Sequence, residues 1–159
     1  MSEGGEAGIP PCSEHSPTLE QSGPAPQAPR ADEESEGPSY FVLDEIDWPD
    51  ESRAPTAPLE LVEEAQRLGA RRKFLARGEG GFFSQYSEFP AGYTVPGHRH
   101  DHDEMIVVLD GSCTMSDGRV LGRFDSVVLH AGFEYGFTAG PDGMVFLTIR
   151  GGKSTTTLA

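Results

Sequence analysis

The stretch of residues 92–111 constrains the fold more than any other part of this chain, because it sets ligand-type side chains at strand spacing. His98 and His100 are two residues apart, so in a β-strand both imidazoles point to the same face. The Asp-His-Asp sequence at 101–103 consists of polar turn formers, and Glu104 then opens an apolar run. We therefore predict two strands joined by a turn, with two imidazoles and one carboxylate facing one pocket. Such a donor set suits a first-row transition metal.

The same stretch resembles the first motif of the cupin family, which is a glycine, five residues, His-x-His, three or four residues, a glutamate, six residues and a glycine. Gly92, His98, His100, Glu104 and Gly111 match every specified position. The resemblance implies an all-β double-stranded β-helix, or jelly-roll barrel, in a small single-domain cupin. It also implies a metal held by His98, His100 and Glu104. We expect Fe(II) first, with Zn, Mn or Ni as alternatives.

The second cupin motif is matched only loosely. It is a glycine, five residues, Pro-x-Gly, two residues, a histidine, three residues and an asparagine. Gly132 keeps its place. Phe124 stands where the first glycine belongs, His130 replaces the proline, and Ala139 stands at the asparagine. Tyr135 takes the place of the histidine that supplies a fourth metal ligand in cupins, so the resemblance leaves that ligand unassigned.

Three roles are open to Tyr135. A free phenol has a pKa of about 10, so it ligates at neutral pH only if a strong Lewis acid such as Fe(III) lowers that pKa. Otherwise the neutral phenol donates a hydrogen bond to a bound substrate, or the ring is simply a core aromatic. We take Tyr135 as the candidate catalytic residue, which would orient or protonate the substrate.

Two further histidines are candidates for completing the site. His102 shares the parity of His98 and His100, but the cupin pattern places it in a turn. It is then either an exposed loop histidine or a substitute ligand or proton shuttle. The resemblance puts His130 near the pocket rim, where it could replace the missing ligand. The sequence leaves open whether Tyr135, His130 or His102 completes the metal site.

Composition divides the chain near residue 40. Residues 1–39 are rich in Pro, Gly, Ser and Glu, and they hold eight acidic residues against one arginine. Such a segment cannot bury enough apolar surface to offset its ordering entropy. We predict a disordered acidic tail over 1–39, which serves as an interaction tail or a solubilising extension, and a cupin domain over 40–159.

Charge and hydropathy argue against several partners. The formal net charge is −14, and the basic cluster at 71–73 is short, so we expect no nucleic acid as partner. The apolar runs are far shorter than the roughly 20 residues of a membrane span, and no signal peptide is visible. Cys12 and Cys113 lie on opposite sides of the domain boundary, which argues against a structural disulfide. We expect a soluble, cytoplasmic protein that does not bind membranes.

Beyond residue 39 the pattern indicates many short strands separated by glycine turns, as in a sandwich or barrel. An amphipathic helix is predicted over 59–68, with Leu61, Val62, Ala65 and Leu68 on one stripe. The remaining expectations, besides the motif strands, are strands over 40–43, 71–76, 82–89, 113–115, 119–121, 125–129 and 144–149, turns at 78–81 and 116–118, and a packing anchor at Trp48.

Two strand segments, 105–109 and 127–129, are apolar on both faces. A strand with one face toward a barrel interior and the other toward water should alternate with polar residues. The outer face is therefore covered, either by the N-terminal strand and helix of this chain or by a second subunit. We predict a homodimer.

The resemblance also implies a function. We expect a metal-dependent enzyme that acts on a small molecule, of the non-haem-iron dioxygenase type. The same triad serves cupin isomerases and lyases, and a non-catalytic ligand-binding or sensor module is a further alternative. A redox-active metal that activates O2 would separate these functions. Aromatic residues predict an aromatic lining, and hence an apolar or aromatic substrate: Phe82, Phe83, Tyr86, Phe133 and Phe137.

Overall fold

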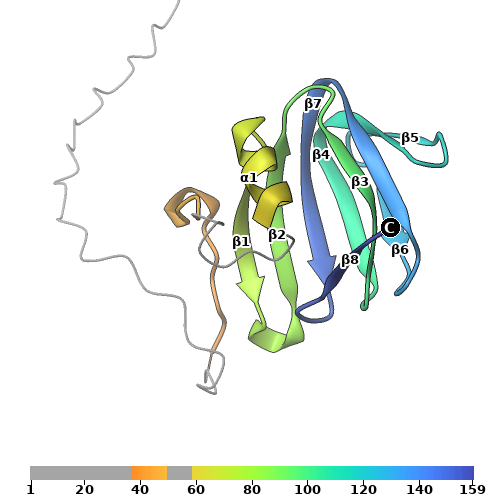
Figure 1. The fold of residues 1–159 in the computed structure, drawn as a ribbon. Helices are drawn as coiled ribbons and strands as arrows, with labels where there is room; N and C mark the ends of the chain where they lie inside the picture. Colours follow the sequence, from red (N-terminus) through yellow and green to blue (C-terminus); the bar gives the residue numbers. More distant parts are fainter. Residues whose placement is uncertain (1–36, 50–58) are drawn as a thin grey trace, which may run out of the picture.

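A computed structural model describes residues 37–49 and 59–159 of the chain. In these residues one eight-stranded antiparallel sheet curls into a barrel with a helix beside it (Figure 1). The elements are α1 Leu59–Arg67, β1 Arg71–Arg77, β2 Phe83–Phe89, β3 Thr94–His100, β4 Glu104–Met115, β5 Val120–Gly122, β6 Ser126–Leu129, β7 Tyr135–Arg150, β8 Thr156–Leu158 and two 3₁₀ turns, Leu43–Glu45 and Glu79–Gly81. The predicted all-β jelly-roll fold with a short N-terminal helix is confirmed. The predicted tail lies outside the described residues, except for 37–39.

Two long strands, β4 and β7, connect the two halves of the barrel. The second half of β7 pairs with β2 and β4, and its first half pairs with β3 and β4. The register of the β4–β7 pair shifts twice around Gly111, which bends the strands. For these two strands the sequence predicted only short pieces, namely the motif strand that Glu104 opens, 113–115 and 144–149. Those bounds are wrong, because pairing continues through the glycines that were interpreted as breaks.

Gly111 lies at this bend. Its φ of 68° is in the left-handed region, which L side chains rarely adopt. A Cβ on Gly111 would lie 2.1 Å from the carbonyl oxygen of Gly143 on β7, well inside van der Waals contact. The close approach of β4 and β7 therefore requires the glycine that ends the first cupin motif.

The core lies inside the barrel and is built from inward-facing residues of β4 to β7. Cys113 belongs to it as a free thiol, and burial raises the pKa of that thiol to about 11. Period-two alternation along each strand sends these side chains inward. The cluster consists of Ile106, Val108, Cys113, Met115, Leu121, Leu129, Tyr135, Phe137, Ala139, Met144 and Phe146.

The N-terminal part of the domain differs from the expectation. The predicted strand over 40–43 is wrong: the chain is irregular there and enters a 3₁₀ turn at Leu43. Tyr40 is largely exposed, so this segment has no strand to pair with and little surface to bury. Trp48 does pack on the barrel, with its ring 4.1 Å from the guanidinium carbon of Arg71 and 6.4 Å from the Tyr86 ring.

The predicted helix is confirmed as α1, and the chain leaves it through Gly69, which has a φ of 93°. Val62 is buried, whereas Leu68 is exposed just beyond the helix, so the predicted stripe is wrong at that end. In the described part of the chain, no helix is long and apolar enough to cross a bilayer.

The outer face of the barrel is open at β4 and β6. Met105 and Val128 are partners across these two strands and are 36% and 54% exposed. Helix α1 lies beside β1 and β2, on the opposite side of the barrel from β6 (Figure 1). The first of the two alternatives, a cover formed by the N-terminal strand and helix, is therefore wrong. The short link through Ala70 keeps α1 next to β1. The homodimer stays a prediction.

Candidate functional site

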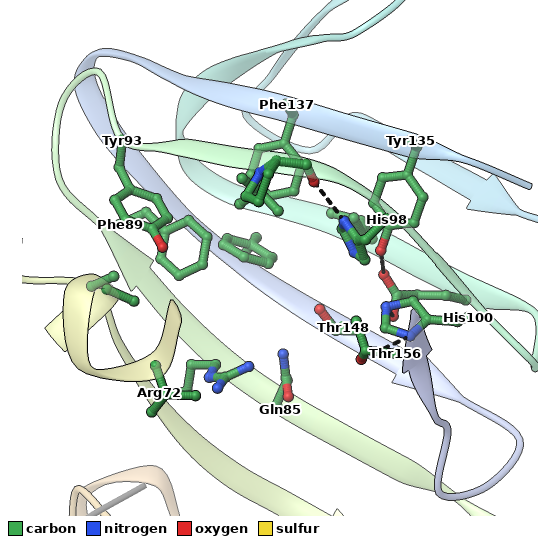
Figure 2. A pocket seen from close by; sticks show the side chains of 18 of the residues that line it. Arg72, Gln85, Phe89, Tyr93, His98, His100, Tyr135, Phe137, Thr148 and Thr156 are labelled. Carbon is green, nitrogen blue, oxygen red and sulfur yellow. Dashed lines mark hydrogen bonds and ion pairs between the residues drawn. The ribbon is translucent and has the colours of Figure 1, made fainter. Parts of the chain in front are cut away.

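A cavity of about 150 Å³ lies inside the barrel, next to the core (Figure 2). Strands β2, β3, β4 and β7 supply most of its wall, and residues of α1, β1 and β8 complete it. One part of the cavity is aromatic and the other is polar. The aromatic part is lined by Phe89, Tyr93, Phe137 and Phe146, and the polar part by Gln85, His98, His100, Glu104, Thr148 and Arg150.

His98 and His100 are at the end of β3, and both are buried with their rings in the cavity wall. Their ring centroids are 5.0 Å apart. The predicted placement on one face is confirmed, since residues two apart on a strand share a face. His98 Nδ1 donates to the carbonyl oxygen of Pro96 at 2.9 Å, because a carbonyl only accepts. The lone pair of His98 is therefore on Nε2.

Glu104 opens β4, as predicted, and its carboxylate is buried. Each carboxylate oxygen already accepts a hydrogen bond. The Tyr135 hydroxyl donates to Oε1 at 2.5 Å, and Arg150 Nε donates to Oε2. The carboxylate is thus neutralised by a guanidinium and held by a phenol, all inside the barrel.

His100 also interacts with the Arg150 side chain. Its Nε2 is 3.4 Å from Arg150 Nη2 and 3.5 Å from Glu104 Oε2. A guanidinium can only donate, so Nε2 accepts and Nδ1 carries the proton. That Nδ1 lies 3.3 Å from the hydroxyl oxygen of Thr156 on β8, a strand that the sequence did not predict. Burial lowers the pKa of His100, which favours this neutral form.

Tyr135 is buried at the start of β7, and its ring centroid is 4.3 Å from that of His98. Burial raises the pKa of Tyr135, and the neighbouring Glu104 carboxylate raises it further. The phenol is therefore protonated and donates to Glu104. In this structure Tyr135 belongs to the core, which is one of the three roles that the sequence allows, and its hydroxyl donates to Glu104. Its role as a hydrogen-bond donor to a substrate stays a prediction.

The donor types of this cluster suit a first-row metal, but their arrangement does not. A metal would need the lone pair of His100 Nε2 and an oxygen of Glu104, and Arg150 engages both. In the described ranges, 37–49 and 59–159, no group of three His, Cys, Asp or Glu side chains is placed to hold a metal ion. As the side chains lie, His98, His100 and Glu104 share one cavity wall without forming a metal centre.

The two other candidate histidines lie outside the cavity. His102 is in the turn after β3, where its Nδ1 is 2.9 Å from Asp101 Oδ1. His130 follows β6 and is largely exposed, with its Nδ1 3.7 Å from Asp103 Oδ2. Neither ring lines the cavity that contains Tyr135, because both turns project from the end of the barrel into solvent.

The predicted aromatic lining is mostly wrong. Of the five aromatic residues, Phe137 alone lines the cavity. Phe82 and Phe133 are exposed, while Phe83 and Tyr86 pack against other rings. The start of the strand and the alternation of its side chains explain this difference. Phe82 precedes β2, and Tyr86 is at a position of β2 whose side chain faces out of the barrel.

Sequence reasoning missed several polar residues of the wall, among them Gln85, Thr148 and Arg150. Thr148 and Arg150 have the same parity on β7 as Phe146, which lies in the core. The sequence did contain a signal for Arg150: it lies at an even spacing from Phe146, so its side chain faces the same side of the strand. It was overlooked because the predicted strand stopped at residue 149.

The barrel has the double-stranded β-helix fold of cupin proteins, and the chain is similar to several solved structures of that fold. It is similar to KdgF from a Halomonas species, with 25% identity, a TM-score of 0.53, and coverage of 70% of this chain and 94% of that one. An RmlC-like cupin from Shewanella frigidimarina has 17% identity and a TM-score of 0.54, covering 72% and 90%. A cupin-like protein from Thermotoga maritima has 20% identity and a TM-score of 0.50, covering 57% and 75%. No protein-family model and no curated protein matches the sequence.

The fold shows what one departure from the second motif does to the backbone. Phe124 has a φ of 71°, and it is the non-glycine residue with positive φ in the described part of the chain. Glycine adopts this conformation without a steric penalty, which is a physical reason for a glycine at this place in the cupin pattern. The exposed Phe124 keeps the backbone turn, since its N–H still donates to Val108 at 2.8 Å.

Proposed function

We propose that this cupin domain binds a small, uncharged molecule in the cavity, through a hydroxyl or amide group of that molecule. The supporting observation is a pair of buried polar side chains that face the cavity (Figure 2). Gln85 and Thr148 are partners across β2 and β7 and are 6% and 2% exposed. Among the described residues, no hydrogen bond engages either side chain. A ligand hydroxyl or amide in the cavity could therefore bond to both side chains, and each such hydrogen bond contributes about 0.5–1.5 kcal/mol.

The chemistry of the wall indicates the class of ligand. An amide and a hydroxyl each both donate and accept, as a ligand hydroxyl or amide does. The charges of Glu104 and Arg150 compensate each other. Of the two other arginines that line the cavity, Arg71 is paired with Glu88 and Arg72 already has an interaction of its own, so these charges favour an uncharged ligand. The aromatic part of the cavity suits an apolar body. A cavity of about 150 Å³ in another protein accepts benzene, so the ligand is of that order of size.

A thermal-shift panel tests this proposal. The probes are phenols, cyclohexanediols and small amides, with carboxylates of the same size as the charged comparison. We expect uncharged hydroxyl or amide compounds to raise the melting temperature in a concentration-dependent way, because a ligand that binds the folded state stabilises it. Gln85→Leu should abolish the shift.

Ser87→Ala is the matched control for that variant. Ser87 is the next inward-facing residue on β2, and its buried hydroxyl also has no partner in the described structure, but it does not line the cavity. The shift should persist in Ser87→Ala. A larger shift with carboxylates, or an unchanged shift in Gln85→Leu, would show that the proposed ligand class or its contact is wrong.

A second candidate is the metal-dependent dioxygenase that the sequence predicts, with Tyr135 as the proton-holding group. Two observations favour it. His98 presents its Nε2 lone pair, and the 3.5 Å between His100 Nε2 and Glu104 Oε2 is close to the roughly 3.4 Å between two donors on one tetrahedral metal. When bound, Fe(II) would polarise both O2 and the substrate. This candidate requires Arg150 to leave Glu104.

Oxygen uptake tests the second candidate. Metal-free protein is loaded anaerobically with Fe(II) and exposed to O2 with catechols, dicarbonyls and hydroxyketones. The dioxygenase predicts substrate-dependent uptake that is absent from the metal-free protein. Uptake that is equal with and without Fe(II) would remove this candidate in favour of a cupin isomerase, a lyase or a binding module. The homodimer and the cytoplasmic location remain part of the proposal.

A further inference from the structure

We propose that Arg150 binds the side chains that would otherwise hold the predicted metal, and that this interaction sets the affinity of the site for divalent metals. This inference deepens the second candidate function and concerns the same wall of the cavity. It does not depend on the small-molecule proposal, which rests on Gln85 and Thr148.

The position of Arg150 is set by the backbone. It is the last residue of β7, and its Cα is paired directly with Glu104 on β4 and with Phe83 on β2. Side chains that are directly opposite on neighbouring strands come into contact. The guanidinium carbon lies 5.7 Å from the centroid of the Phe83 ring, and only 10% of the Arg150 side chain is exposed. The contact with Glu104 is therefore built into the sheet register.

Arg150 uses the lone pairs that a metal would require. Its Nε donates to Glu104 Oε2, and its Nη2 donates to His100 Nε2. Zinc and iron take two or more protein donors at about 2.0–2.2 Å, which these lone pairs cannot provide while they accept from a guanidinium. A divalent ion beside the displaced guanidinium would also meet a like charge in a poorly screened interior. Both effects weaken metal binding.

The experiment is a titration of metal-free protein with Co(II), followed by calorimetry and by the absorption of the bound ion. Arg150→Met keeps the length and apolar stem of the side chain and removes its charge and donors. We expect Arg150→Met to bind one Co(II) at least about tenfold more tightly than the wild type, in the range that outer-shell groups exert on metal affinity. Adding His98→Ala to Arg150→Met should abolish the gain.

Two controls separate the local effect from net charge and from misfolding. Arg99→Met removes an exposed arginine between the two histidines and should leave the Co(II) affinity at the wild-type value. Arg150→Lys keeps a cation that donates to Glu104, and it should bind Co(II) as weakly as the wild type. If Arg150→Met does not fold, a Co(II) affinity in Arg150→Lys equal to the wild-type value supports the proposal, and a tenfold gain there overturns it.

Equal Co(II) affinities in the wild type and Arg150→Met would overturn the proposal, as would the absence of Co(II) binding in both. The melting temperature gives a second readout, since Co(II) should raise it more in Arg150→Met than in the wild type. Failure here leaves the thermal-shift result with Gln85→Leu unaffected, so the two proposals fail separately.

Discussion

Replacing Glu104 with leucine is expected to lower the free energy of unfolding by about 3–5 kcal/mol, the cost of leaving one member of a buried ion pair without its partner. Arg150 would keep its charge in a mostly buried position, and the buried Tyr135 hydroxyl would lose its acceptor. Urea unfolding followed by circular dichroism measures the effect as a shift in the midpoint at constant slope.

Two further variants test whether the loss comes from the uncompensated charge. Glu104→Leu combined with Arg150→Met should recover most of the stability, because an apolar pair of similar volume replaces a buried ion pair at little cost. Glu88→Ala breaks the Arg71–Glu88 ion pair on the outside of the barrel and should cost less than about 1 kcal/mol. If Glu104→Leu costs no more than Glu88→Ala, the Arg150–Glu104 pair does not have the buried character described above.

Gly111→Ala should destabilise the domain by about 3 kcal/mol. The substitution places a Cβ in the left-handed region, which costs about 1–2 kcal/mol. It also drives that Cβ to 2.1 Å from the Gly143 carbonyl oxygen, so the β4 and β7 backbones must separate. Overpacking of this kind costs about 1–3 kcal/mol. Denaturant unfolding gives the sum of the two terms.

Gly118→Ala isolates the conformational part of that cost. Gly118 has a φ of 86° in the turn after β4, and a Cβ there meets nothing within 4 Å. Its loss should be about 1–2 kcal/mol, the conformational cost alone. The difference between the two variants measures the β4–β7 contact. Equal losses would mean that the strands yield without cost, contrary to the role given to the motif glycine.

The sequence predicted the features that depend on neighbours along the chain. His98 and His100 share a face because strand side chains alternate with period two, and this holds in any sheet that contains them. Glu104 opens the next strand because the Asp-His-Asp turn precedes it. The helix at α1 and the Gly turns were predicted for the same reason. The resemblance to cupins then supplied the barrel that joins these pieces.

Contacts between distant segments could not be predicted in this way. Arg150 meets Glu104 because the β4–β7 register pairs them across 46 residues, and a one-residue slip would turn Arg150 outward. The aromatic lining was misassigned for the same reason, since strand bounds decide which face Phe82 or Phe89 presents. A local pattern specifies which side chains are presented together, whereas strand pairing specifies what they meet. At this site the local pattern predicted a set of metal donors, and the strand pairing showed that the carboxylate of that set is already bound by Arg150.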